Sequence, residues 1–143
     1  MNSEILAYTA GIVDGEGCVA IAVYITKDSR TNYRLVVDVA NTYKVVIAWL
    51  HETFGGSISF TALNNRRPCW IWHIGGRKAS LFLESIRPFL RVKALQADLA
   101  VEFQVGLIGR VGRHNRRTDE ELAERESYKE AISMLNHGTY VQI

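Results

Sequence analysis

The sequence predicts an α+β fold in which four antiparallel strands form one sheet and helices cover one of its faces. Apolar residues recur at helical spacing in some segments and at every second position in two pairs of others, in the order αββαββα. A short polar connector joins the members of each pair, so we expect two antiparallel hairpins. Helices set apart from an antiparallel sheet form a two-layer α+β architecture. The length of 143 residues favours a single domain over residues 1–143.

The first helix is expected over residues 4–14, with Ser3 as its N-cap. One of its faces carries Ala7, Gly11 and Gly15 at four-residue spacing, and a stripe without side-chain bulk lets a second backbone approach closely. Gly11 costs roughly 1 kcal/mol relative to alanine in a helix interior. We therefore expect this stripe to serve tight packing between two helices.

The helix is expected to end at Gly15 and Gly17, because glycine tolerates a left-handed turn. Glu16 lies between them, where the helix dipole is negative and the last carbonyls lack partners. A carboxylate there is repelled unless a cation joins it, and Mg²⁺ prefers oxygen ligands. One carboxylate would hold the ion weakly, so two copies of the helix would make a usable site. The alternative is a packed helix that ends in a solvated glutamate.

The other elements follow in order along the chain. Strands are expected at 18–26 and 33–40, a helix at about 43–54, strands at 57–61 and 69–74, helices at about 78–86 and 91–105 with a break at Pro88, and a polar helix from Asp119 to about Leu135. The glycine- and arginine-rich stretch 106–117 is expected to be a loop. It and the acidic last helix form a C-terminal addition, residues 106–143, whose role the sequence leaves open.

The helix-free face of the sheet is expected to be polar, with small apolar groups between the polar ones. Such a mixture suits base edges in DNA, because hydrogen-bonding groups lie beside groups that can meet a thymine methyl. Basic residues in the connectors suit phosphates. The side chains expected to contact DNA are Tyr24, Thr26, Lys27, Arg30, Arg34, Asp38, Ser57, Ser59, Thr61, Arg66, Arg67, Ile71 and His73. A merely solvated sheet face is the alternative.

Charge is distributed unevenly along the chain, although the formal net charge is only +2. Residues 61–117 contain eleven Lys or Arg against three acids, and residues 118–143 contain six acids against two bases. A basic middle suggests that part of the surface contacts a polyanion. A solvated charged face is the alternative.

The two cysteines, Cys18 and Cys69, lack metal-binding spacing and suit reduced thiols. The sequence has no apolar run of membrane-spanning length and no signal-peptide pattern. We therefore expect an intracellular protein, in the cytoplasm, nucleoid or an organelle matrix, with no membrane partner.

Residues 9–17 read TAGIVDGEG and resemble the nine-residue motif that names the LAGLIDADG homing endonucleases. Seven of the nine positions match or are close substitutions, while Thr9 and Gly15 depart. With the element order and the later segment 88–93 (PFLRVK), the resemblance covers about residues 4–105. It implies the family's αββαββα core with a saddle-like four-stranded sheet, followed by C-terminal helices.

The resemblance implies double-strand DNA cleavage with Mg²⁺ or Mn²⁺ at a long pseudo-palindromic site, leaving short 3′ overhangs. It implies that Glu16 binds the metal with the Gly15 carbonyl nearby, that Lys93 lies close to the scissile phosphate, and that Asn41 places water. The alternative for Lys93 is a solvated lysine on a helix, and the alternative for Asn41 is a helix cap. Cys18, the only candidate covalent nucleophile, is interpreted as sheet surface.

Only one copy of the motif is present, which implies a homodimer that reads a pseudo-palindrome. The side chains expected at the interface are Ala7, Ala10, Gly11 and Asp14. A strand of about seven residues spans roughly 23 Å, or on the order of seven base pairs per half-site. Two rival functions stay open: a cleavage-inactive DNA- or RNA-binding relative, such as an intron maturase or transcriptional regulator, and a metabolite-binding dimer unrelated to nucleic acid.

Overall fold

The computed structural model describes residues 1–62, 64, 67–108 and 118–138. In chain order its elements are α1 (Ser3–Glu16), β1 (Gly17–Ile25), β2 (Thr31–Asn41), α2 (Lys44–Phe54), β3 (Ser57–Thr61), β4 (Cys69–Gly75), α3 (Gly76–Ile86), the 3₁₀ turn η1 (Arg87–Phe89), α4 (Ala94–Ile108) and α5 (Asp119–Asn136). The predicted α+β order is confirmed.

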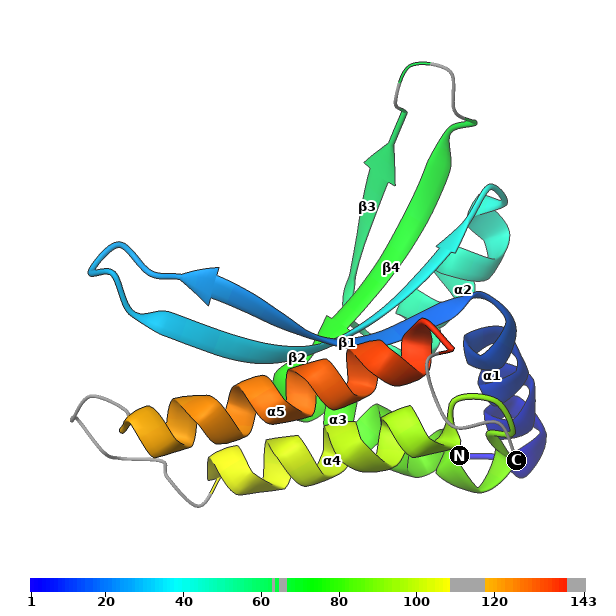
Figure 1. The fold of residues 1–143 in the computed structure, drawn as a ribbon. Coiled ribbons are helices and arrows are strands. Elements are labelled where there is room, and N and C mark those ends of the chain that lie inside the picture. The colour runs from blue at the N-terminus through cyan, green and yellow to red at the C-terminus, as the bar shows by residue number, and fades with distance from the viewer. Residues whose placement is uncertain (63, 65–66, 109–117, 139–143) are drawn as a thin grey trace.

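The four strands form one sheet in the order β1-β2-β4-β3, and all neighbouring strands are antiparallel. The two hairpins diverge from the middle of the sheet, so the face without helices is concave (Figure 1). The five helices of the described residues lie on the other side, and each contacts a strand. The predicted saddle with helices on one face is therefore confirmed.

Strand alternation separates a buried face from an open one. Leu35, Val37 and Val39 of β2 are fully buried against the helices, and Trp72 of β4 is buried with them. The residues between them belong to the concave face, as the alternation predicts. Burial does not continue along the whole of β1, because Ile25 near the hairpin turn is 73% exposed.

The ends of α1 differ from the sequence-based expectation. Asn2 is the N-cap, and its side chain accepts a hydrogen bond of 2.6 Å from the backbone N–H of Glu4, while Ser3 is already helical. The helix continues through Gly15 to Glu16, and Gly17 is extended with φ −86°. The predicted left-handed end is therefore wrong. Gly17 is required for space instead, because a Cβ atom there would lie 2.7 Å from the carbonyl oxygen of Val13.

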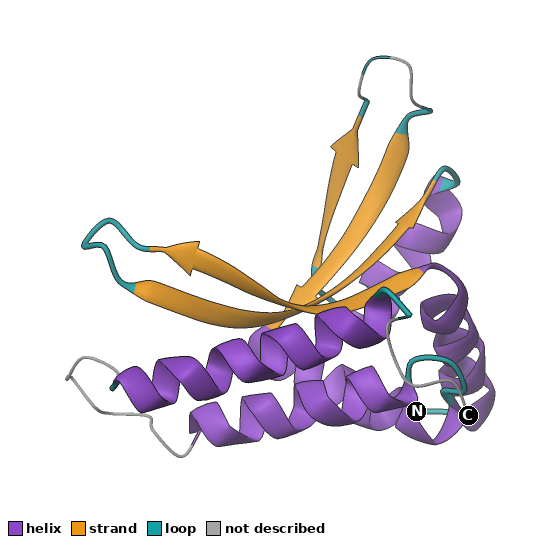
Figure 2. Ribbon diagram, in the orientation of Figure 1, coloured by secondary structure: helices purple, strands orange, loops and turns teal. Residues whose placement is uncertain are grey.

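The acidic helix α5 packs beneath the β1–β2 hairpin and beside α4 (Figure 2). Ile132 is fully buried, and the amide of Asn136 donates a hydrogen bond of 2.8 Å to the carbonyl of Val19. The hydroxyl of Tyr33 donates to Glu126 at 2.8 Å. This helix therefore supports one hairpin from below. Helix α4 begins at Ala94 and ends at Ile108, so it begins and ends later than the predicted 91–105. Residues 109–117 of the expected loop lie outside the described residues.

Over the described residues, the helices are too short or too polar to cross a lipid bilayer.

Candidate functional site

The end of α1 and the end of β2 meet beside the concave face. Gly17 at the start of β1 pairs with Val39, so residue 41 of β2 comes close to the last turn of α1. The side-chain amide of Asn41 donates a hydrogen bond of 2.5 Å to Oε2 of Glu16. Its oxygen accepts a bond of 2.8 Å from the backbone N–H of Tyr43. Asn41 thus holds the Glu16 carboxylate and anchors the entry to α2 at the same time.

Asp14 brings the segment before α4 to the same corner. Its carboxylate accepts hydrogen bonds from the backbone N–H groups of Arg91, Val92 and Lys93 at 2.9, 3.1 and 2.9 Å. The ammonium of Lys93 donates a bond of 2.8 Å to the carbonyl oxygen of Asp14. A cation there compensates the negative end of the helix dipole. The three predicted catalytic residues, Glu16, Asn41 and Lys93, are therefore gathered at the C-terminal end of α1.

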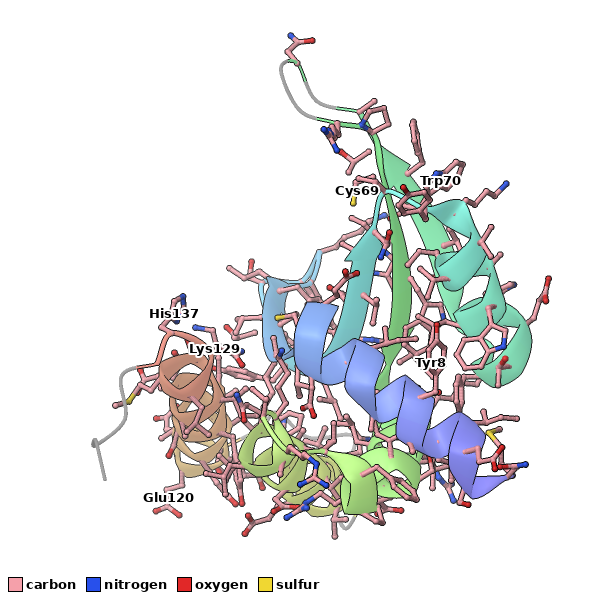
Figure 3. The ribbon with its side chains drawn as sticks, turned by 90° about the vertical axis from the view of Figure 1, so that its right-hand side faces the viewer. Tyr8, Cys69, Trp70, Glu120, Lys129 and His137 are labelled. Atoms are coloured by element: carbon pink, nitrogen blue, oxygen red, sulfur yellow. The ribbon has the colours of Figure 1, made fainter. Side chains whose placement is uncertain are left out.

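One face of α1 is open at the surface of the chain. An added Cβ atom at Gly11 or Gly15 would meet nothing within 4 Å, and Ala7 is exposed. Tyr8 borders this stripe and is 59% exposed (Figure 3). Its ring packs edge-on against that of Trp49 on α2, with ring centroids 5.3 Å apart. We call Ala7, Gly11 and Gly15 the glycine stripe.

The other two residues predicted at the dimer interface face inward. Ala10 is fully buried in the hydrophobic core of its own chain. The carboxylate of Asp14 is committed to the segment before α4. Both side chains are thus engaged within their own chain, and their place at a dimer interface stays a prediction.

The concave face contains a hydrogen-bonded array across three strands. Nδ1 of His73 on β4 lies 2.7 Å from Oδ1 of Asp38 on β2, and its Nε2 lies 2.7 Å from the hydroxyl of Ser59 on β3. The sequence predicts that all three residues share this face. It does not predict the array, because contact between them depends on the pairing register of β2 with β4.

A hollow of about 490 Å³ lies next to this array, and Arg34, Asp38, Ser57, His73 and Lys78 line it. The guanidinium of Arg34 lies over Gly75, where a Cβ atom would be 2.6 Å from its Nε. Glycine at this position makes room for the side chain. Sequence reasoning missed Lys78, whose only signal is its place in the first turn of the helix that follows β4.

The other residues predicted to contact DNA are divided between the sheet and its turns. Strand register places Tyr24, Arg34, Asp38, Ser57, Ser59, Thr61, Ile71 and His73 on the concave face. Thr26 and Arg30 are engaged within the β1–β2 turn: the Thr26 hydroxyl accepts a bond from the backbone N–H of Arg30, whose guanidinium pairs with Asp28 at 3.1 Å. Lys27 and Arg67 are exposed, and Arg66 lies outside the described residues.

Cys18 lies between the Glu16 corner and the array. Desolvation raises the pKa of its thiol most, the carboxylate of Asp38 raises it further, and Lys93 opposes both. The thiol is therefore kept neutral, which disfavours its use as a nucleophile.

The described residues contain no group of three or more His, Cys, Asp or Glu side chains that could hold a metal ion. Glu16, at the exposed end of α1, offers a carboxylate, and the carbonyl of Gly15 is adjacent in the chain. Oxygen donors of this kind fit Mg²⁺, which keeps several of its waters.

No family model matches the sequence, and no curated protein matches it. Solved structures match its fold. The homing endonuclease I-CvuI, in complex with the I-CreI target in the presence of 2 mM Mg with the DNA not cleaved, aligns with a TM-score of 0.76 at 19% identity, over 99% of this chain and 87% of that chain. The archaeal intron-encoded homing endonuclease I-Vdi141I, complexed with DNA, gives 0.75 at 18% identity, over 93% and 84%.

The LAGLIDADG homing endonuclease I-SmaMI, bound to cleaved DNA, gives a TM-score of 0.70 at 17% identity, over 88% of this chain and 43% of that chain. At these identities the similarity is one of fold, and it extends over most of the chain in each case. It agrees with the resemblance of residues 9–17 to the family motif. The chain has the fold of the LAGLIDADG homing endonucleases.

Proposed function

We propose that this protein is a site-specific, metal-dependent DNA endonuclease that works as a homodimer. The observation that carries the proposal is the gathering of Glu16, Asn41 and Lys93 at the end of α1, directly beside a concave polar sheet face. The matched structures of I-CvuI and I-Vdi141I are homing endonucleases in complex with DNA, which supports the same substrate here.

The concave face would bind the DNA duplex. Its side chains combine donors, acceptors and small apolar groups, as base recognition requires. The strand β1 has nine residues, two more than the length used above to estimate the half-site. At about 3.3 Å per residue it spans roughly 30 Å, so each half-site grows to about nine base pairs at ~3.4 Å per pair.

Dimerisation would complete the cleavage site. The glycine stripe is open, so two α1 helices can approach backbone to backbone across a two-fold axis. That arrangement brings two Glu16 carboxylates together at the ends of the two helices. The single carboxylate of one chain then becomes part of a shared set of oxygen ligands.

Each side chain has a separate task in phosphodiester hydrolysis. Glu16 and the Gly15 carbonyl would hold Mg²⁺ or Mn²⁺, which polarises a phosphate and activates water when bound. Asn41 fixes the orientation of Glu16 through the 2.5 Å bond, and its second amide N–H remains for a water. Lys93 is held beside the end of α1 and would offset the negative charge that develops on the phosphate.

The test is cleavage of a plasmid that carries a site selected from a randomised DNA library. We expect linearisation with Mg²⁺, none with a chelator, and short 3′ overhangs when the ends are sequenced. The variant Glu16→Gln keeps the shape of the side chain and loses its charge, so it should bind DNA without cleaving it. Mg²⁺-dependent nicking by that variant would remove Glu16 from the mechanism.

A cleavage-inactive DNA- or RNA-binding protein is the second candidate. It is favoured by one observation: a single chain forms the concave sheet face, whereas its described residues contain no group of three or more His, Cys, Asp or Glu side chains that could hold a metal ion. The same assay separates the two functions, since a binding protein would retain the selected DNA and leave it intact in Mg²⁺. A metabolite-binding dimer would not select DNA at all.

A further inference from the structure

Three side chains on the concave face form a continuous hydrogen-bonded chain, which we call the Asp38–His73–Ser59 relay. Both ring nitrogens of His73 are engaged, Nδ1 with Oδ1 of Asp38 and Nε2 with Oγ of Ser59, each at 2.7 Å. The residues come from β2, β4 and β3, which are neighbours in the sheet. Whether Asp38 and Ser59 offer a hydrogen-bond donor or an acceptor to an outside partner therefore depends on where the protons of the relay lie.

With Asp38 ionised and the His73 imidazole neutral, hydrogen-bond chemistry fixes those protons. An ionised carboxylate only accepts hydrogen bonds, so the bond to Asp38 requires a proton on Nδ1 of His73. In a neutral imidazole the other nitrogen is then an acceptor, and the hydroxyl of Ser59 must donate to it. Ser59 keeps only its lone pairs for a further partner, and the second oxygen of Asp38 is also an acceptor. Both ends of the relay thus present acceptors outward.

We propose that the relay makes the concave face select base amino groups at the positions that Asp38 and Ser59 contact. This inference rests on the proposed DNA-binding function. In the major groove only N4 of cytosine and N6 of adenine offer N–H donors, whereas guanine and thymine offer acceptors. Asp38 and Ser59 make the contacts, and His73 is a positioning residue that sets their polarity.

The same connectivity could instead activate Ser59 as a nucleophile, because a histidine held by a carboxylate is also the base of serine hydrolases. The surroundings favour recognition. Nucleophilic catalysis needs N–H donors aimed at a developing oxyanion. In a sheet the backbone N–H groups lie in the plane of the strands and the side chains stand out of that plane, so the N–H groups of β2, β4 and the edge strand β3 are not aimed at a group bound on the concave face.

The experiment is selection from a library randomised over the half-site, read out as base preference at every position. We expect the wild type to prefer C or A at the two base positions that Asp38 and Ser59 contact. Ser59→Ala should reduce that preference about tenfold at one of them. Asp38→Asn should reduce it at both, because an asparagine amide can donate to Nδ1 of His73, reverse the relay and free the Ser59 proton. His73→Gln interrupts the relay without changing Asp38 or Ser59, and it should reduce the base preference at the position that Ser59 contacts.

A double variant separates the relay from a structural effect. If the relay acts on Ser59, Asp38→Asn should change nothing further at the Ser59 position once Ser59→Ala is present. Ser57→Ala is the matched comparison, because it removes a hydroxyl from the same face of the same strand, and its effect should fall at another position.

Three results would overturn the inference, and they are distinguishable. A wild-type chain that selects no sequence contradicts the proposed function and the relay with it. Selection by the wild type, with the Ser59 position unaltered in both folded variants Asp38→Asn and His73→Gln, contradicts the relay alone. Covalent labelling of Ser59 by a fluorophosphonate, lost in His73→Gln, would assign the array to nucleophilic catalysis.

Discussion

At the last turn of α1, Asp14 connects the motif helix to the segment that carries Lys93. Its carboxylate accepts three backbone hydrogen bonds, and its carbonyl accepts the ammonium of Lys93. Bonds from N–H groups to an ionised carboxylate are charge-assisted and stronger than neutral ones. One residue therefore both closes this part of the fold and holds a candidate catalytic side chain.

The variant Asp14→Asn should destabilise the protein by about 2 kcal/mol, because the amide loses the charge and one acceptor oxygen. It should also reduce DNA cleavage more than DNA binding, since the backbone of the segment that carries Lys93 is held less firmly while the concave face is intact. Urea unfolding measures the first effect, and gel shift with plasmid cleavage measures the second. The control is Glu130→Gln, which changes an exposed carboxylate on α5. Equal unfolding midpoints for the two variants would contradict the role of Asp14.

Residue chemistry predicts the site better than it predicts side-chain direction. The motif points to Glu16, and the structure brings Asn41 to its carboxylate and Lys93 to the nearby carbonyl of Asp14, from segments far along the chain. Periodicity within one helix does not tell an inward small residue from an outward one: the sequence groups Ala10 with the interface, and in the single chain it is fully buried. The steric need for Gly17 also depends on the path of β1 beside Val13, which the sequence does not show.

At the scale of elements, the glycine stripe of α1 is the surface on which the proposed dimer depends. The variant Gly11→Leu places a large side chain where the second helix would approach, so the dimer should dissociate to monomers in sedimentation velocity. Gly106→Leu is the matched control, because Gly106 is also helical and an added Cβ there meets nothing within 4 Å. A dimer of unchanged affinity in Gly11→Leu would contradict the proposed packing.

The turn η1 is tied to α4 by a bidentate ion pair. Nε and Nη2 of Arg87 donate to the two oxygens of Asp98 at 2.6 and 2.9 Å. The hydrogen bonds from Arg87 lower the pKa of the Asp98 carboxyl. Since the folded pKa is below the unfolded one, the pair stabilises the fold above the ordinary carboxyl pKa, about 4. That contribution is lost as the pH falls through the lowered value.

We therefore expect Asp98→Asn to lower the melting temperature at neutral pH, with a difference from the wild type that shrinks on acidification. Thermal melts followed by circular dichroism across the acid range measure it. The control Glu52→Gln changes an exposed carboxylate on α2. Its melting-temperature difference from the wild type should not shrink on acidification. A constant gap between Asp98→Asn and the wild type at all pH values would argue against the pair.

Element order and type are well predicted from periodicity, and boundaries less well. The break at Pro88 is confirmed as the turn η1, where the helix cannot continue through proline. The position of α5 could not be predicted, because its support of the β1–β2 hairpin comes from contacts distant in sequence, such as Asn136 with Val19. Composition shows only that this helix is acidic.

At the scale of the whole molecule, the helices and the proposed binding face lie on opposite sides of the sheet (Figure 2). Exposed cations on the sheet side should contribute to DNA affinity by releasing counterions. Arg67→Ala, near the start of β4, should weaken binding to all sequences and reduce the salt slope by about one per contact. Filter binding between low and moderate salt measures it. Lys129→Met on α5 is the control, and an equal loss of slope there would contradict this orientation of the DNA.

The same separation of faces has a consequence for how this protein can vary. In the middle of β2 every second residue belongs to the core, and the residues between them face outward. Adjacent residues are therefore constrained differently, one by packing and the next by what the outer face contacts. Outward positions can drift with a changing target while inward ones stay within packing limits. A fold retained at 19% identity is the expected outcome of such independence. Retargeting by exchange of outward residues alone should therefore leave the scaffold intact.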